Sequence, residues 1–264
     1  MLICPKCKNN LIPDGKSYRC KSGHCYDVAK KGYVNLLMSQ SSKSRHHGDD
    51  KLMAAARRDF LDTNSYRPLV DCILKHTPRR GVFADIGCGE CWYLCNIKDE
   101  RPDLFCVGID ISKEILEVAG ARTKPRGILT AVASGSALPF ADGSLDALLS
   151  VFAPISAGEF HRVLKRGGKI IRVTPDIDHL FELKAAVYDV PRKNDPLDMA
   201  LDGFDIVNTE SLRFSFTVDK TGAKNLFAMT PYYYKTSQTD RQKLNSLNAL
   251  TITAAFVVTV YEKH

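Results

Sequence analysis

From residue 81 onward, short apolar β-rich segments alternate with amphipathic ones. GVFADIG (81–87) and LFCVGID (104–110) predict two strands, followed by helices through about 91–101 and 113–122. The same pattern predicts strands at 128–134, 146–152 and 167–175, and helices at about 157–164 and 179–189. Such alternation is typical of an α/β protein with a doubly wound, mainly parallel sheet, a Rossmann-like fold. Segments 212–218 and 249–261 are expected to close the far edge of this sheet.

The longest apolar run is ALTITAAFVVTVY (249–261), with 13 residues and three threonines. A helix that spans a bilayer needs about 20 residues, and the β-branched side chains favour a buried strand. The N-terminus has no leader of charged and then apolar residues. The sequence therefore predicts a cytoplasmic protein without a membrane partner, in which thiols stay reduced.

Positive charge is concentrated near the start of the chain. Residues 1–58 contain twelve Lys and Arg against four Asp and Glu, a net charge of +8, whereas residues 59–264 contain 25 against 26, a net charge of −1. A basic segment suits a polyanionic partner because it neutralises phosphates and releases counterions. A solvated surface would show the same charge, so the charge alone leaves both interpretations open.

Four of the nine cysteines lie in the first 25 residues. Cys4 and Cys7 form a C-x2-C pair, and Cys20 and His24 form C-x3-H after twelve intervening residues. Two such turns can direct their ligands at one point, and a closed Cys3His set is typical of structural zinc in a ribbon too small to bury a core. Cys25 is a competing fourth ligand at C-x4-C spacing, although the spacing favours His24.

The motif ADIGCGECW lies where the first predicted strand turns into a helix. Gly87 and Gly89 let main chain approach a ligand at the helix N-terminus, and Asp110, at the end of the second strand, can accept hydrogen bonds from two ribose hydroxyls. A dinucleotide fingerprint needs a third glycine where this chain has a tryptophan. We therefore expect S-adenosylmethionine, which has a ribose but no phosphate, with Asp85 facing its amino-acid end.

Several stretches from end to end carry a resemblance to one family. Besides the zinc-ligand pairs, they are YDVAKKGYVNLL (26–37), RRDFLDTNSY (57–66), DIGCGE (85–90), LPFADGSLDALL (138–149), FAP (152–154), HLFELK (179–184) and AMTPYYY (228–234). On these residues the chain resembles the bacterial 23S ribosomal RNA guanine-N1 methyltransferases. The resemblance implies S-adenosylmethionine-dependent methylation of one guanine in a hairpin loop of 23S ribosomal RNA, a zinc-ribbon recognition domain and a homodimer.

The resemblance also implies roles for individual residues. At Cys91 the family usually has a third glycine, and we expect cysteine to be tolerated there if its main chain stays helical. SVFAP (150–154) lacks the Asn/Asp-Pro-Pro-aromatic signature of exocyclic-amine methyltransferases, which fits a ring nitrogen better. Cofactor contacts are carried over to Tyr66, Glu90, Cys91 and His179, beside Gly87, Gly89 and Asp110, and zinc ligands to Cys4, Cys7, Cys20 and His24.

Methylation of guanine N1 requires its proton to leave, and a general base would assist. Glu90, Asp85 and Asp142 are candidates that the sequence does not separate. The tyrosines of YYY (232–234) could stack on the target base, although packing of strand-edge aromatics against the core is the favoured interpretation.

Three segments are expected along the chain: a zinc ribbon at 1–37, a linker and helical segment at 38–65, and a methyltransferase domain at 66–264. Two other functions remain open. A catalytically weak or silent RNA-binding paralogue is favoured only by Cys91. A small-molecule methyltransferase would have the same fold, but would give no reason for a basic ribbon.

Overall fold

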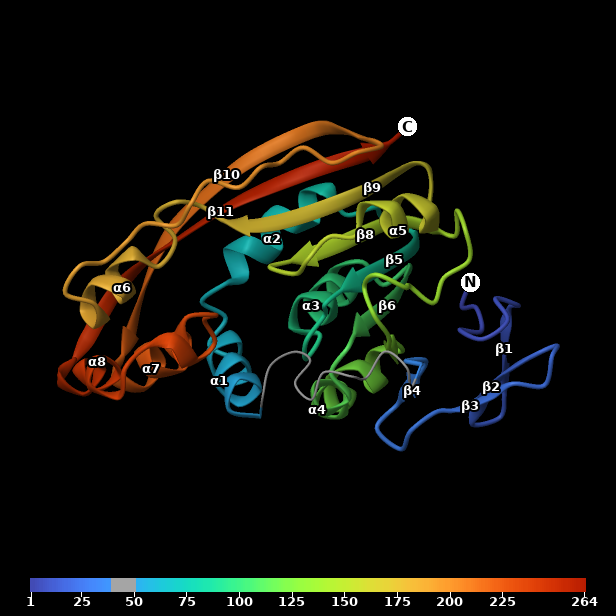
Figure 1. The fold of residues 1–264 in the computed structure, drawn as a ribbon, viewed down its shortest axis with the longest axis horizontal. Coiled ribbons are helices and arrows are strands. Elements are labelled where there is room, and N and C mark those ends of the chain that lie inside the picture. Colours follow the sequence, from blue (N-terminus) through green and yellow to red (C-terminus); the bar gives the residue numbers. More distant parts are fainter. Residues whose placement is uncertain (39–50) are drawn as a thin grey trace.

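The computed structural model describes residues 1–38 and 51–264, and its main feature is an eight-stranded sheet (Figure 1). The strand order is β10-β11-β9-β8-β5-β6-β7-β4. Pairings among β4 to β9 are parallel, whereas β11 is antiparallel to both β9 and β10, which confirms the predicted sheet. The strands are β4 (Tyr33–Asn35), β5 (Gly81–Ile86), β6 (Leu104–Asp110), β7 (Leu129–Val132), β8 (Leu145–Val151), β9 (Leu164–Pro175), β10 (Phe204–Asp219) and β11 (Ala249–Lys263).

The central strands are apolar on both faces because both faces of the sheet are covered. On β5, Phe83 belongs to one hydrophobic core and Ala84 to the other. On β6, Cys106 and Val107 divide in the same way. This alternation places the ends of both strands between two packed layers, where a loop can be held in a fixed position.

Helices α2, α3 and α4 contribute to the core on one face of the sheet, and α5 contributes to the core on the other. Helices α6, α7 and α8 gather at the end of the long β10–β11 pair that lies away from the chain termini (Figure 1). None of the helices in the described part of the chain is long and apolar enough to cross a bilayer. The helices are α1 (Lys51–Leu61), α2 (Arg67–His76), α3 (Trp92–Glu100), α4 (Lys113–Thr123), α5 (Ala157–Val163), α6 (Phe181–Val187), α7 (Lys220–Ala228) and α8 (Gln238–Gln242).

The N-terminal segment forms a small antiparallel sheet that docks on the large domain. Its strands are β1 (Leu11–Asp14), β2 (Ser17–Cys20) and β3 (Cys25–Asp27). Leu2 pairs with Phe140, and both are buried in one hydrophobic core. The ribbon, expected to be too small to bury a core, therefore shares one with the large domain.

Two segments extend the large domain beyond its predicted start at residue 66. β4, which the sequence places in the ribbon, pairs with β7 at the edge of the large sheet. Helix α1 lies in the predicted linker 38–65, part of which falls outside the described residues, and it packs against α7. Residues of α1 can therefore contribute to a site in the large domain.

The tyrosines at 232–234 do not lie on a strand as expected. Tyr233 and Tyr234 belong to a 3-10 turn, Tyr233–Lys235, that follows α7. Tyr232 and Tyr233 pack their rings 5.5 and 5.9 Å from that of Phe227, whereas Tyr234 is exposed. Two of the three therefore pack against the core, although the surrounding backbone is helical rather than extended.

Candidate active site and zinc ribbon

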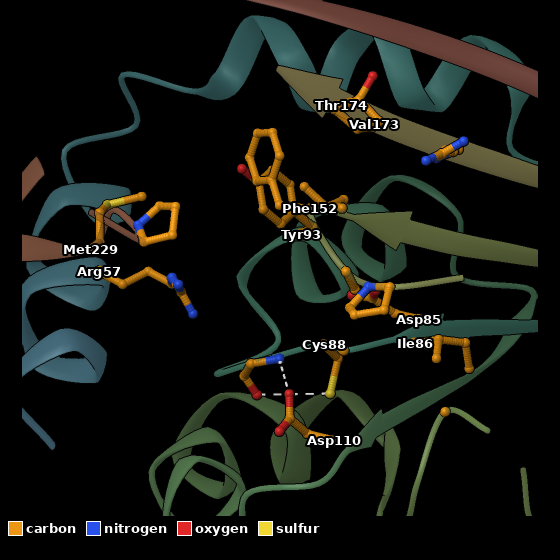
Figure 2. Close-up of a pocket in the computed structure, with 18 of the residues that line it drawn as sticks. Arg57, Asp85, Ile86, Cys88, Tyr93, Asp110, Phe152, Val173, Thr174 and Met229 are labelled. Atoms are coloured by element: carbon orange, nitrogen blue, oxygen red, sulfur yellow. Dashed lines mark hydrogen bonds between the residues drawn. The ribbon is translucent and has the colours of Figure 1, made fainter. Parts of the chain in front are cut away.

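A cavity of about 890 Å³ opens at the carboxyl ends of the parallel strands (Figure 2). It lies where β6 and β8 flank β5 on opposite sides, the position at which open α/β sheets bind ligands. Its volume is within the range of about 300–1,000 Å³ that small-molecule sites use. The loops after β5, β6, β7 and β8 line it together with residues from α1 and the segment after α7.

The predicted glycine loop forms one wall of the cavity. Gly87 and Gly89 both have left-handed backbone, at φ of 77° and 53°. A β-carbon on Gly87 would stand 2.7 Å from Cβ of Ala153, so a larger residue would push the β8 loop away. The Gly89 amide donates to Oδ2 of Asp110 at 2.9 Å, and Oδ1 of the same carboxylate accepts from the Ser112 amide at 2.8 Å.

These two hydrogen bonds fix the Asp110 carboxylate between the loops after β5 and β6. Each carboxylate oxygen has a second lone pair, so the group can also accept from ribose hydroxyls. Asp110 is therefore a carboxylate that two main-chain amides hold at the position where a nucleoside ligand would need an acceptor. Sequence spacing identified the acid but gave no sign of these main-chain contacts.

The expected helical backbone at Cys91 is wrong. Cys91 has φ of 63° and ψ of 26°, a left-handed conformation that glycine adopts without strain. Its thiol is buried, with Sγ 3.4 Å from Sγ of Cys88. A β-carbon on Gly108 of β6 would stand 3.0 Å from the Cys91 sulfur. The glycine at 108 therefore leaves room for the side chain that Cys91 adds to this loop.

Two of the three candidate bases line the cavity. Asp85 is buried, and this burial and the charge of Asp110 raise its pKa to about 8. Glu90 is also buried, which raises its pKa, and its Oε1 has no hydrogen-bond partner among the described residues. Asp142 is exposed outside the cavity and bonded to Arg162 at 2.7 Å. The structure therefore brings together Asp85 and Glu90 and leaves Asp142 apart.

Tyr66 and His179 line the cavity from separate elements, just before α2 and α6. Tyr66 is buried, and its ring meets that of Phe256 edge-on at 5.2 Å. His179 Nδ1 accepts a hydrogen bond from the Ala255 amide at 3.2 Å, and burial lowers its pKa to about 3. The imidazole is therefore neutral at ordinary pH, and its ring can face the ligand without adding charge.

Among the cavity residues that sequence reasoning missed, Phe152 and Arg57 stand out. Phe152, directly after β8, has a left-handed φ of 55° and a ring that is 45% exposed although it lines the cavity. Arg57 projects from α1 toward the glycine loop (Figure 2). Only the FAP and RRDFLDTNSY stretches of the resemblance covered these positions, and neither stretch assigned them a role.

The four predicted zinc ligands meet in the ribbon. The ligand atoms of Cys4, Cys7, Cys20 and His24 lie within 4.8 Å of one another, with Cys4 Sγ 3.4 Å from Nδ1 of His24. Cys25 is exposed and lies outside this group. Three thiols and one imidazole are the donors that tetrahedral structural zinc prefers, so the residues fit this metal.

Comparisons with known proteins extend over both parts of the chain. A family model described as RlmA, N-terminal, a zinc ribbon, matches residues 2–45, and a methyltransferase-domain model matches residues 84–172. A 23S rRNA (guanine(748)-N(1))-methyltransferase of Streptomyces fradiae is 32% identical, over 97% of this chain and 95% of its own. A Bacillus subtilis protein provisionally named a 23S rRNA guanine-N1 methyltransferase is also 32% identical, over 96% and 94%.

Solved structures agree on the fold. A Haloferax volcanii chain, provisionally described as a methyltransferase and solved with the Trm112 methyltransferase activator, matches with a TM-score of 0.50. It is 17% identical, and the match covers 82% of this chain and 99% of that chain. At this identity the likeness shows a shared methyltransferase fold and nothing about the substrate.

Proposed function

The chain belongs to the family of 23S ribosomal RNA guanine-N1 methyltransferases, and we propose that it methylates N1 of one guanine in a hairpin loop of 23S ribosomal RNA, using S-adenosylmethionine. The identity to the Streptomyces fradiae enzyme, which extends over 97% of the chain and so includes the ribbon, carries this conclusion. The cavity supports it, because Gly89 and Asp110 meet at the ends of β5 and β6, where a nucleoside would bind.

The cavity residues suggest how the cofactor lies. Asp110 would accept from the ribose hydroxyls, and Ile111 and Ile115, which follow it along the wall, would flank the adenine. The methionine end would then extend past Gly87 toward Asp85, whose carboxylate suits an ammonium group. When bound, the cofactor supplies an activated methyl group on a positively charged sulfur, so the protein mainly aligns the two reactants.

The target guanine would enter from the β8 side of the cavity. A base must leave its stack to reach a buried methyl donor, and loop bases are the cheapest to extrude. Phe152 offers an exposed ring there, 6.0 Å from the neutral His179 ring, and its strained backbone is of the kind that functional sites retain. With Asp85 paired to the cofactor's ammonium, Glu90 would be the candidate base left to take the N1 proton, since its Oε1 has no hydrogen-bond partner among the described residues.

The zinc ribbon would hold the RNA outside the cavity. Its docking on the large domain fixes a basic surface beside the methyltransferase fold, which a small-molecule enzyme does not need. The slope of log RNA affinity against log salt concentration measures the number of phosphate contacts. Reversing the charge of three ribbon lysines should reduce the steepness of this slope by roughly 0.7–0.9 per lost contact. The exposed lysines of the ribbon and the turn after it are Lys6, Lys8, Lys16, Lys21, Lys30 and Lys31.

A ribosomal RNA substrate places the reaction in the cytoplasm, where reduced thiols keep the zinc site intact. We also propose that the protein works as a homodimer, as the family resemblance implies. Sedimentation of the purified protein at micromolar concentration tests this, and a monomer with full activity would refute it.

The function is tested with labelled S-adenosylmethionine, 23S ribosomal RNA from a strain that lacks the gene, and two control substrates. We expect label on 23S ribosomal RNA and none on small-subunit RNA or on small quinones and amines. RNA binding without transfer would favour the catalytically silent paralogue, and label on a small molecule alone would favour the small-molecule enzyme. Either result would overturn the proposal.

A further inference from the structure

We propose that Arg57 on α1 binds the carboxylate at the methionine end of S-adenosylmethionine. The inference rests on the proposed function, because it takes this cofactor as the ligand of the cavity. It adds a cofactor contact from α1, which lies before residues 84–172, the part of the chain that the methyltransferase-domain model matches. It thereby gives a role to a residue in the segment expected to be a linker.

The charges that line the cavity call for a cation at one end. Three acidic side chains line the cavity: Asp85, Glu90 and Asp110. They suit the positively charged sulfonium and ammonium of the cofactor and the hydroxyl donors of its ribose. The cofactor also carries one carboxylate, and neither the Asp110 carboxylate nor the buried acids Asp85 and Glu90 could pair with it. Only Arg57 and Arg172 among the described lining residues carry a full positive charge, since His179 is neutral.

The glycine loop offers little main chain to a carboxylate. The amides of Gly87 and Cys88 both donate to the Ile109 carbonyl, at 2.8 and 3.0 Å. The Gly89 amide donates to Asp110, and the Cys91 amide donates to the Cys88 carbonyl at 2.8 Å. Four of the five amides from 87 to 91 are therefore engaged, so this loop differs from anion sites built on free amides.

Arg57 is the cation placed beside this loop. Its Nη1 lies 3.8 Å from the point where a β-carbon on Gly89 would stand, and its charge lowers the pKa of Glu90 against the effect of burial. Figure 2 shows its guanidinium directed from α1 into the cavity, facing the loop that bonds to Asp110.

Arg172 lies on β9, and its Nη1 is 3.4 Å from the Tyr261 hydroxyl and 3.5 Å from the Asp198 carbonyl. Its contacts thus direct it toward β11 and the segment before β10. A guanidinium binds a carboxylate through two parallel hydrogen bonds, a geometry that a single lysine cannot provide. The side chain of Arg57 therefore matches both the charge and the shape of the group it would hold.

Titration calorimetry with two ligands, in the absence of RNA, tests the proposal. The ligands are S-adenosylmethionine and decarboxylated S-adenosylmethionine, which keeps the sulfonium and the ammonium. Arg57→Gln should weaken binding of the first by about 10- to 100-fold, the effect of one charge-assisted bidentate contact, and of the second by less than about threefold. Arg57→Lys keeps the charge but not the paired donors. Its affinity for S-adenosylmethionine should therefore lie between those of the parent and of Arg57→Gln.

Arg58→Gln is the matched control, since Arg58 is the next residue of α1, bonds to Asp59 at 3.2 Å and does not line the cavity. It should leave both affinities unchanged. Equal weakening of both ligands by Arg57→Gln, or no weakening, would overturn the assignment.

If Arg57→Gln fails to fold, the unmodified protein still decides the matter. It should bind S-adenosylmethionine at least about tenfold more tightly than the decarboxylated form, and equal affinities would overturn the proposal. Because no RNA is present, loss of the proposed function would appear separately, as cofactor binding without methyl transfer.

Discussion

Replacement of Asp110 should weaken the fold as well as cofactor binding. Its two carboxylate oxygens accept from the amides of Gly89 and Ser112 and so join the loops after β5 and β6. Asp110→Ala removes both acceptors. Asp110→Asn keeps one acceptor but turns an amide NH2 toward the other amide, so two donors face each other.

The magnitude follows from the two bonds. A hydrogen bond to a charged group contributes about 1.5–3 kcal/mol. In the variant, water from the cavity can reach the two amides that lose their acceptor, so we take the lower end of this range for each bond. Asp110→Ala should then lose about 3 kcal/mol of unfolding free energy, a fall in melting temperature of about 6–12 °C. Asp110→Asn should lose at least half as much. Both should weaken S-adenosylmethionine binding by at least about tenfold.

Thermal unfolding followed by circular dichroism, and titration calorimetry well below the melting temperature, measure the two effects. Asp103→Asn, an exposed carboxylate one residue before β6, is the control and should change neither quantity. An Asp110→Ala protein that melts like the parent would refute the structural role. Unchanged cofactor affinity would refute the ribose contact.

Three further predictions concern other parts of the molecule. Metal analysis should find one zinc per chain in Cys25→Ser and less in His24→Ala. The reverse result would show that Cys25, and not His24, is the fourth zinc ligand. Because the pKa of Asp85 is raised to about 8, the folded protein keeps a proton that the unfolded chain releases, so the unfolding free energy of the ligand-free protein should fall as pH rises from about 4 to about 8. Cofactor affinity should rise over the upper part of this range by up to about tenfold per pH unit, because the ammonium would bind the ionised carboxylate. Asp85→Asn should remove both pH trends. Identical pH profiles for variant and parent would contradict this role of Asp85. Phe152→Ala should weaken RNA binding by about 5- to 150-fold, the worth of one base stack, without changing cofactor affinity, whereas the equally exposed Phe105→Ala should not; equal effects would refute the stacking role.

The parts of the fold that sequence predicted are those where burial decides the pattern. Strands β5, β6 and β8 are apolar on both faces, so their apolar runs appear directly in the sequence. The place of Asp110 in the cavity was also predictable, because it ends a strand and parallel strands bring their carboxyl ends together. The zinc ligands followed from local spacing, which needs no tertiary information.

The parts that sequence missed depend on contacts between distant segments. Arg57 lines the cavity from α1, and α1 packs against α7, more than 150 residues away in the chain. β4 is three residues long and becomes a strand by pairing with β7. The left-handed backbone at Cys91 and Phe152 has no signal in the residues themselves, because both types usually avoid it, although the glycine that the family usually has at position 91 pointed to it.

The atom that receives the methyl group tests the central claim most directly. Ribosomal RNA from a strain lacking the gene should be treated with the protein and S-adenosylmethionine, and then analysed by primer extension and by mass spectrometry of nuclease digests. A methyl on guanine N1 blocks Watson–Crick pairing, so we predict one new stop in 23S ribosomal RNA, at a hairpin-loop guanine, and one N1-methylguanosine per molecule. Methylation of another atom, or of no base in 23S ribosomal RNA, would contradict the account.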